Sequence, residues 1–251
     1  MEGSRVVNEE EKKIKHYSSV HQILLVGEGD FSFSACLAEA FGSAANMTAT
    51  SLDSREMLML NYSKASTNLK SLEDGGCTIL HGVDACTMSH HPLLFGKSFD
   101  RIVFNFPHAG FLFQEHDCTQ IEMHKALVRG FLGSARNILK EKGEVHVTHK
   151  TANPFDRWEI EKLAEEVGLS LVEKAWFDKW DYPGYQNKRG SGFKCNESFP
   201  VVSFRFSRFL SPITELHYKF LPGKEPLGFD NTLNKANQTA QLKLTAKFHG
   251  K

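Results

Sequence analysis

The sequence predicts a single α/β domain built on a mostly parallel seven-stranded sheet with helices on both faces. Short apolar runs alternate with longer segments of helical periodicity, which is the pattern of repeated β-α-β units. Several of these runs end in glycine or aspartate. The chain has 251 residues, 41% of them hydrophobic, and therefore has enough apolar side chains for one core of this size.

Seven apolar runs are expected to form strands, over residues 21–26, 47–52, 78–83, 99–104, 144–149, 169–176 and 199–206. Helical periodicity covers residues 33–41, 55–72 and 123–139, and a further helix is expected from Pro154 to about Val167. Gly75, Gly76 and Gly168 follow helical segments and supply stop signals. The last two strands are close enough in sequence to pair antiparallel at an edge of the sheet.

The chain divides into a charged lead-in of residues 1–19, a domain of residues 20–210 and a proline-containing tail of residues 211–251 whose order the sequence does not fix. The chain has no apolar stretch near the length of a membrane span, and its first residues lack a signal-peptide core, so an intracellular location is expected. The five cysteines have no C-x-x-C spacing and predict neither a disulfide framework nor a zinc ribbon.

Net charge gives no sign of a polyanion partner. The 30 basic and 30 acidic residues cancel, so any contact with nucleic acid must rest on a local patch or on an assembly partner. No metal site is expected: His146 and His149 have H-x-x-H spacing, but on a strand they face opposite sides of the sheet.

The first strand ends in Val26-Gly27-Glu28-Gly29-Asp30-Phe31-Ser32. Glycines at this edge of an open α/β sheet let backbone amides approach a ligand. A dinucleotide fingerprint would have glycine at position 32, which holds serine, and the two acids would repel a pyrophosphate. The acids suit a ligand with an ammonium group, such as the methionine part of S-adenosylmethionine.

Two aspartates end the next two strands. Asp53 closes the second strand, where an acid can hold ribose hydroxyls, and Asp84 closes the third, where an acid can accept from an adenine amino group. Taken singly, either is more often a solvated strand end or a helix cap. Their position beside the glycine loop favours the cofactor interpretation.

The fourth strand ends in Asn105-Phe106-Pro107-His108-Ala109-Gly110, a loop that resembles the Asn/Asp-Pro-Pro-aromatic loops of nitrogen methyltransferases. Together with the glycine loop, it makes residues 20–209 similar to the ribosomal RNA (uridine-N3) methyltransferase family. The resemblance rests on five blocks, at residues 26–34, 49–53, 99–108, 158 and 182–185.

The resemblance implies a Rossmann-like class I methyltransferase fold, methyl transfer from S-adenosylmethionine to N3 of a uridine in large-subunit ribosomal RNA, and a nucleolar location. The expected cofactor-binding residues are Gly27, Glu28, Gly29, Asp30, Ser32, Asp53, Asp84 and Asn105.

At the target, uridine N3 carries a proton that must leave, and His108 is the candidate base because imidazole titrates near neutral pH. His108 could equally cap the loop by hydrogen bonding. Asn105 could bind a uracil carbonyl, and Phe106 with Pro107 could hold the ring. Because a stacked base must be exposed to react, aromatic residues are expected around the site, with Phe111, Phe113, Tyr182 and Tyr185 as candidates.

The segment of residues 182–194 interleaves aromatics, glycines and the cations Lys188, Arg189 and Lys194, which favours an RNA contact over a plain surface hairpin. Lys150, at the end of the fifth strand, could contact phosphate but is more simply a solvated charge.

Two other functions stay open. The chain could be a catalytically silent methyltransferase-fold protein that binds RNA or a protein partner. It could also be a nicotinamide-dependent oxidoreductase, against which Ser32 and the acidic loop argue.

Overall fold

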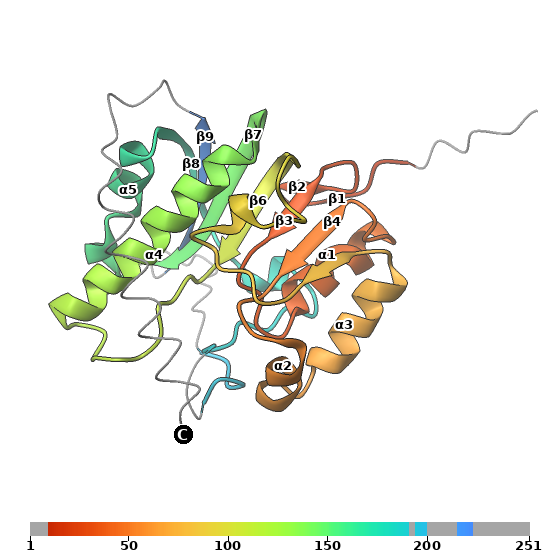
Figure 1. The fold of residues 1–251 in the computed structure, drawn as a ribbon, viewed down its shortest axis with the longest axis horizontal. Helices are drawn as coiled ribbons and strands as arrows, with labels where there is room; N and C mark the ends of the chain where they lie inside the picture. The colour runs from red at the N-terminus through yellow and green to blue at the C-terminus, as the bar shows by residue number, and fades with distance from the viewer. Residues whose placement is uncertain (1–9, 191–193, 200–214, 223–251) are drawn as a thin grey trace, which may run out of the picture.

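The computed structural model describes residues 10–190, 194–199 and 215–222 (Figure 1). Its main sheet has seven strands in the order β5-β4-β3-β6-β7-β9-β8. The strands are β3 (Ile23–Leu25), β4 (Met47–Thr50), β5 (Thr78–Leu80), β6 (Phe99–Asn105), β7 (Leu139–Lys150), β8 (Leu169–Trp176) and β9 (Glu215–Pro222). Six of these strands run in the same direction, and β9, between β7 and β8, runs in the opposite one. The predicted fold class is confirmed.

Helices cover both faces of the sheet (Figure 1). On one face lie α1 (Ser32–Phe41), α2 (Arg55–Asn61) and α3 (Ala65–Asp74), and on the other lie α4 (Cys118–Asn137) and α5 (Ile160–Glu166). Side chains along β3 alternate between two cores: Ile23 and Leu25 pack with the first set of helices, and Leu24 packs with the second. The sheet is therefore buried on both faces.

Short 3-10 turns complete the described elements: η1 (Met88–His90), η2 (Phe155–Trp158) and η3 (Lys179–Asp181). Because β3 to β7 are all parallel, their carboxyl ends meet at one edge, and the loops after them carry the glycine loop and the predicted acids. No helix in the described part of the chain is both long enough and apolar enough to span a bilayer.

The helix predicted over residues 55–72 is two helices. The first, α2, ends at Asn61, and Tyr62 takes an extended conformation with its ring buried. That ring lies under the glycine loop, where a β-carbon on Gly29 would come within 3.3 Å of it. The helix therefore ends at Asn61, and Tyr62 takes the extended conformation that places its ring against the loop.

The lead-in is more ordered than expected. Strands β1 (Lys13–Ile14) and β2 (Tyr17–Ser18) form a small hairpin. The Tyr17 ring is 1% exposed, packs edge-on against Phe33 and makes a 3.1 Å hydrogen bond between its hydroxyl and Nδ1 of His146. Burial of this one large side chain fixes the segment onto the domain.

Strand β9 comes from the segment that the sequence assigned to the tail. It inserts between β7 and β8 and pairs antiparallel with both. Tyr218 and Phe220, two residues apart, pack into the same core, while His217 and Lys219 are buried without belonging to it. The strand at 169–176 pairs antiparallel with β9 and not with the expected partner at 199–206, most of which lies outside the described residues.

Candidate active site

The glycine loop joins β3 to α1 and is shaped by a close approach to β6. Gly27 has a φ of 66°, and a β-carbon there would lie 2.4 Å from Cε2 of Phe104. Only glycine avoids both the left-handed strain and the collision. The backbone of the predicted cofactor loop therefore lies directly against the strand that leads to the Asn105 loop.

Glu28 faces α1. Its Oε2 accepts from the backbone N–H of Ser34 at 3.2 Å and from the Ser34 hydroxyl at 2.8 Å. The carboxylate thus satisfies an amide in the first turn of α1, whose N-cap residue Phe31 makes no side-chain cap. Burial raises the pKa of Glu28 to about 7, against the hydrogen bonds from Ser34 that favour the charged form. These contacts make it a helix-capping residue.

Replacing Glu28 by glutamine is expected to change how stability depends on pH. In the unfolded chain Glu28 has its ordinary pKa of 4.5, and in the folded protein its pKa is about 7. Between pH 4.5 and about pH 7 the folded protein therefore holds a proton that the unfolded chain has lost, and the free energy of unfolding falls as the pH rises through this range. Glu28→Gln removes this pH dependence. The free energy of unfolding of the variant minus that of the wild type should therefore be roughly 1–3 kcal/mol larger at pH 8 than at pH 5. Denaturant unfolding at both pH values measures it.

The control for that experiment is Glu39→Gln, which makes the same change on an exposed residue of α1. It should give equal differences from wild type at the two pH values. Equal differences for Glu28→Gln as well would contradict the assignment of a raised pKa to Glu28.

Asp30 has one carboxylate oxygen without a hydrogen-bond partner. The side chain is 3% exposed; its Oδ1 accepts from the N–H of Ser32 at 3.0 Å, while Oδ2 is buried and makes no hydrogen bond among the described residues. The nearest cation is Nζ of Lys188, at 3.8 Å. A buried anionic oxygen in this state fits a ligand that brings an ammonium group.

Ser32 holds a second segment over the loop. Its hydroxyl donates to the carbonyl of Gln186 at 3.2 Å and accepts from the N–H of Gln186 at 2.9 Å. Both hydrogen-bonding functions of this side chain are thus used within the chain. Ser32 therefore anchors the segment around Gln186, which we call the covering segment. Its predicted role in binding a cofactor stays a prediction.

The two strand-end aspartates lie at the same edge, after β4 and β5. Burial raises the pKa of Asp53, against the opposing hydrogen bond from the Asn61 side chain. Asp84 uses Oδ1 to accept from the N–H of Cys86 at 2.8 Å, so it caps its own turn. Both can still reach a ligand at this edge, but Asp84 offers one carboxylate oxygen.

Asn105 is the last residue of β6, and only the oxygen of its side-chain amide has a hydrogen bond among the described residues. Its Oδ1 accepts from the Thr148 hydroxyl at 2.7 Å, while Nδ2 is buried and has no partner among the described residues. The next residue, Phe106, has a φ of 51° and donates its N–H to the carbonyl of Thr148 at 2.8 Å. The strained turn projects the loop from the sheet edge beside the glycine loop.

His108 is fixed at both ring nitrogens. Its Nδ1 accepts from the N–H of Gly110 at 3.1 Å, so Nε2 carries the hydrogen that it shares with Oε1 of Glu115 at 2.8 Å. His124 from α4 lies beside it, with Nδ1 accepting from the N–H of Ala109 at 3.1 Å and Nε2 lying 3.2 Å from Oε2 of Glu115 and 3.0 Å from Nε2 of Gln120. We call His108, Glu115 and His124 the imidazole clamp.

The clamp is a hydrogen-bonded structure. Burial would raise the pKa of Glu115, but the hydrogen bonds from the two imidazoles outweigh it and hold that pKa well below its usual range. A metal ion would need the Nε2 lone pairs, yet each Nδ1 already accepts from a backbone N–H, and a neutral imidazole has one lone pair. Of the two roles open to His108, the geometry favours the loop cap over the free base.

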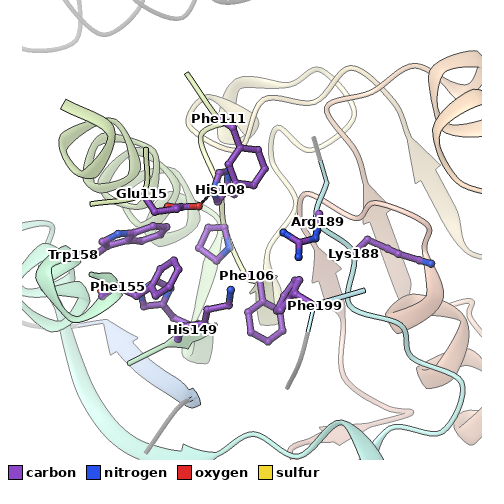
Figure 2. Close-up of a pocket in the computed structure, with 12 residues that line it drawn as sticks. Phe106, His108, Phe111, Glu115, His149, Phe155, Trp158, Lys188, Arg189 and Phe199 are labelled. Carbon is purple, nitrogen blue, oxygen red and sulfur yellow. Dashed lines mark hydrogen bonds and ion pairs between the residues drawn. The ribbon is translucent and has the colours of Figure 1, made fainter. Parts of the chain in front are cut away.

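A pocket of about 190 Å³ opens beside the clamp (Figure 2). Its walls are largely rings, from Phe106, His108, Phe111, His149, Phe155, Trp158 and Phe199, with Pro107, Glu115 and three cations completing them. Among those cations, Nζ of Lys150 lies 4.6 Å from the Phe155 ring centroid and 4.3 Å from that of Phe199. The volume is below the roughly 300 Å³ at which drug-sized sites begin, so the pocket suits one planar ring.

The predicted RNA-contacting residues of the 182–194 segment have different surroundings in the structure. Tyr182 is 4% exposed and stacks on Phe177, and the half-buried Tyr185 packs edge-on against Phe33. Lys188 donates to Oε1 of Gln186 and the carbonyl of Asn196. These three side chains hold the covering segment in place within the chain, and their predicted contact with RNA stays a prediction. Lys188 and Arg189 both line the pocket, and Arg189 is exposed there.

A sequence model described as BMT5-like, rRNA (uridine-N3-)-methyltransferase BTM5-like, matches residues 24–189, about two thirds of the chain. The chain belongs to this family. An uncharacterized protein of Arabidopsis thaliana is 55% identical over 194 residues, covering 76% of this chain and 93% of the relative. The match to the 25S rRNA (uridine(2634)-N(3))-methyltransferase of Saccharomyces cerevisiae is 24% identical over 230 residues, covering 70% of this chain and 68% of that one.

Heavy metal-associated isoprenylated plant protein 41 of A. thaliana is 45% identical over 241 residues, covering 89% of this chain and 47% of that relative. The chain thus spans about half the length of that relative. Among solved structures, a TehB-like SAM-dependent methyltransferase from Corynebacterium glutamicum aligns with a TM-score of 0.46, 17% identity and 80% coverage of each chain.

Within this BMT5-like domain, sequence reasoning assigned no role to several residues of the imidazole clamp and the ring-lined pocket. Glu115 and His124 lie beyond the Asn105 loop, and Phe155 and Phe199 come from two other segments. Trp158, one of the blocks of the family resemblance, lies between the rings of His124 and His149, with ring centroids at 4.2 and 4.3 Å. The available signals were Trp158 itself and the position of His149 at the carboxyl end of β7.

Proposed function

We propose that this chain is an S-adenosylmethionine-dependent methyltransferase that methylates N3 of a uridine in large-subunit ribosomal RNA. The observation that carries the proposal is the juxtaposition of two unlike sites on neighbouring strands. The loop after β3 holds a buried carboxylate oxygen that has no hydrogen bond among the described residues and lies 3.8 Å from Nζ of Lys188, and the loop after β6 forms one wall of a ring-lined pocket. Membership of the BMT5-like family and the name of the yeast relative support the uridine target.

The residues present fit the cofactor. Oδ2 of Asp30 would take the ammonium of its methionine part, and Gly27 allows the backbone to approach. Asp53 would accept from ribose hydroxyls and Asp84 would face the adenine amino group. When bound, S-adenosylmethionine supplies an electrophilic methyl group.

The pocket suits a uracil ring. Phe106 is fixed by edge-to-face contacts with Phe177 and Phe199, at 5.7 and 5.0 Å, so its ring is a rigid wall for a flat base. Lys150 and Arg189 place positive charge around the pocket. Because loss of the N3 proton leaves the uracil ring negatively charged, these cations favour the nucleophilic form of the base.

Loss of the N3 proton requires an acceptor, and His149 is the pocket imidazole that lies outside the imidazole clamp. Nε2 of His149 donates to the carbonyl of Phe155 at 3.0 Å, so the lone pair is on Nδ1. Burial lowers the pKa of His149 to about 4, which keeps the ring neutral at physiological pH but also makes it a weak acceptor for the N3 proton. His108, with both nitrogens in the imidazole clamp, would position the loop.

RNA would be held by few contacts of this chain. Arg189 and the partly exposed rings of Phe111 and Phe113 lie close to the pocket or to its loop and can bind backbone and bases. The zero net charge is consistent with an assembly partner that supplies further affinity. Action on large-subunit ribosomal RNA would locate the protein in the nucleolus.

The test is mass spectrometry of ribosomal RNA nucleosides from cells that lack the protein. N3-methyluridine should fall, and should return with the wild-type gene but not with Asp30→Asn. Unchanged N3-methyluridine, with RNA crosslinking to the protein retained, would instead favour the catalytically silent binding protein. Return of the nucleoside with Asp30→Asn would overturn the assigned cofactor contact.

A further inference from the structure

Three polar side chains form a hydrogen-bonded row behind the site, on the adjacent strands β6, β7 and β9 (Figure 1). The Thr148 hydroxyl lies 2.7 Å from Oδ1 of Asn105 and 3.0 Å from Nδ1 of His217. Thr148 is fully buried and His217 is 1% exposed. Solvent therefore cannot substitute for a missing partner in this row.

The number of hydrogens on Asn105, Thr148 and His217 determines which of these side chains donates and which accepts each hydrogen bond. The single hydroxyl hydrogen of Thr148 goes to Oδ1 of Asn105, so the Thr148 oxygen must accept from Nδ1–H of His217. The remaining group of Asn105 is then its amino group, and Nδ2 is the buried atom without a partner among the described residues. If His217 instead carried its hydrogen on Nε2, Thr148 would donate to His217 and the Asn105 amide would turn over.

Resting on the proposed function, we propose that Thr148 and His217 are positioning residues that hold the Asn105 amide with its NH₂ group toward the target. Facing O4 of uracil, this donor would pair with a carbonyl oxygen, whereas cytosine has an amino group at C4 and would bring two donors together in a buried site. Discrimination therefore requires the Asn105 amide on the O4 side, because both bases have a carbonyl at C2. The row is thus a specificity device built from β9.

The surroundings hold His217 neutral, which the row requires. Its ring is stacked at 5.2 Å on His16 and lies edge-on at 4.7 Å to His146, and Lys219 and Glu144 are the charged groups nearby. Burial, followed by these neighbouring imidazoles and Lys219, lowers the pKa of His217 well below its ordinary value. A neutral ring can occupy one tautomer, as the hydrogen count demands.

The first experiment reads the tautomer of His217 directly. Long-range ¹H–¹⁵N spectra of histidine-labelled protein, assigned with His217→Gln, should show Nδ1 protonated in the wild type and in Thr148→Ser. Thr148→Val keeps the side-chain shape but removes the acceptor, so the signal should move toward Nε2–H. An Nε2–H tautomer in the wild type, or one unaffected by Thr148→Val, would overturn the row.

The second experiment measures methyl transfer to ribosomal RNA from cells lacking the protein. Thr148→Val should lower kcat roughly tenfold or more while KM for S-adenosylmethionine stays within about twofold, and Thr148→Ser should restore kcat. The control is Thr48→Val, the same change at a buried threonine of β4. Wild-type kcat in Thr148→Val would refute a positioning role.

The two experiments separate the possible failures. A wild-type protein that transfers no methyl group to RNA overturns the proposed function, while the tautomer still decides whether the Asn105 amide is fixed. A fixed Nδ1–H tautomer together with full activity of Thr148→Val overturns the catalytic importance of the row and leaves the proposed function intact.

Discussion

Replacing Gly27 by alanine is expected to destabilise the fold by roughly 2–5 kcal/mol and to abolish binding of S-adenosylmethionine. The new β-carbon would have to occupy a left-handed conformation, at a φ of 66°, and would lie 2.4 Å from Cε2 of Phe104. Phe104 cannot yield easily, because its ring is buried against Phe131 at 5.1 Å. The strain must therefore displace the loop that would hold the cofactor. Denaturant unfolding and calorimetric titration measure the two effects.

The matched control is Gly96→Ala, at a φ of 76° with no atom within 4 Å of the added β-carbon. It has the backbone strain without the collision and should cost only about 1 kcal/mol. The double variant Gly27→Ala, Phe104→Leu should be more stable than the sum of its single changes, because the smaller side chain relieves the contact. Equal stability of Gly27→Ala and Gly96→Ala would disprove the role of Phe104.

Asp30→Asn is expected to raise the dissociation constant for S-adenosylmethionine roughly 10- to 100-fold and to leave the stability of the free protein within about 1 kcal/mol of wild type. The amide can still accept the 3.0 Å hydrogen bond from the N–H of Ser32. What it lacks is the charge on Oδ2, the buried oxygen that has no hydrogen bond among the described residues. A loss of binding without loss of stability identifies a ligand contact.

The control for this variant is Asp178→Asn. Asp178 makes the same type of local turn, with Oδ1 accepting from the N–H of Trp180 at 2.9 Å, but it follows β8 and is not part of the glycine loop. It should bind S-adenosylmethionine as the wild type does. If Asp30→Asn also bound normally, the ammonium contact would be wrong, and the acidic loop would need another ligand.

Local patterning was enough to predict the framework. Apolar runs such as Ile23–Leu25 must be buried, and a parallel sheet buries them on both faces; the Gly27 and Asp53 positions then follow because parallel strands end at one edge. Helix periodicity was less reliable where a long-range contact competed with it. Tyr62 ends α2 because its ring supports Gly29, a contact that no local pattern encodes.

The sequence by itself determined six of the seven strands of the sheet, the glycine loop and the family resemblance, since these rest on periodicity and on contiguous residues. Tertiary structure alone decided which side chains remain available to a ligand. Tyr182 is buried by packing and Lys188 makes hydrogen bonds within the chain. His108 is fixed in the imidazole clamp, and β9 places His217 against Thr148. The reason is physical: hydrogen-bond saturation depends on partners far apart in the chain, which only the folded arrangement brings within 3 Å or so.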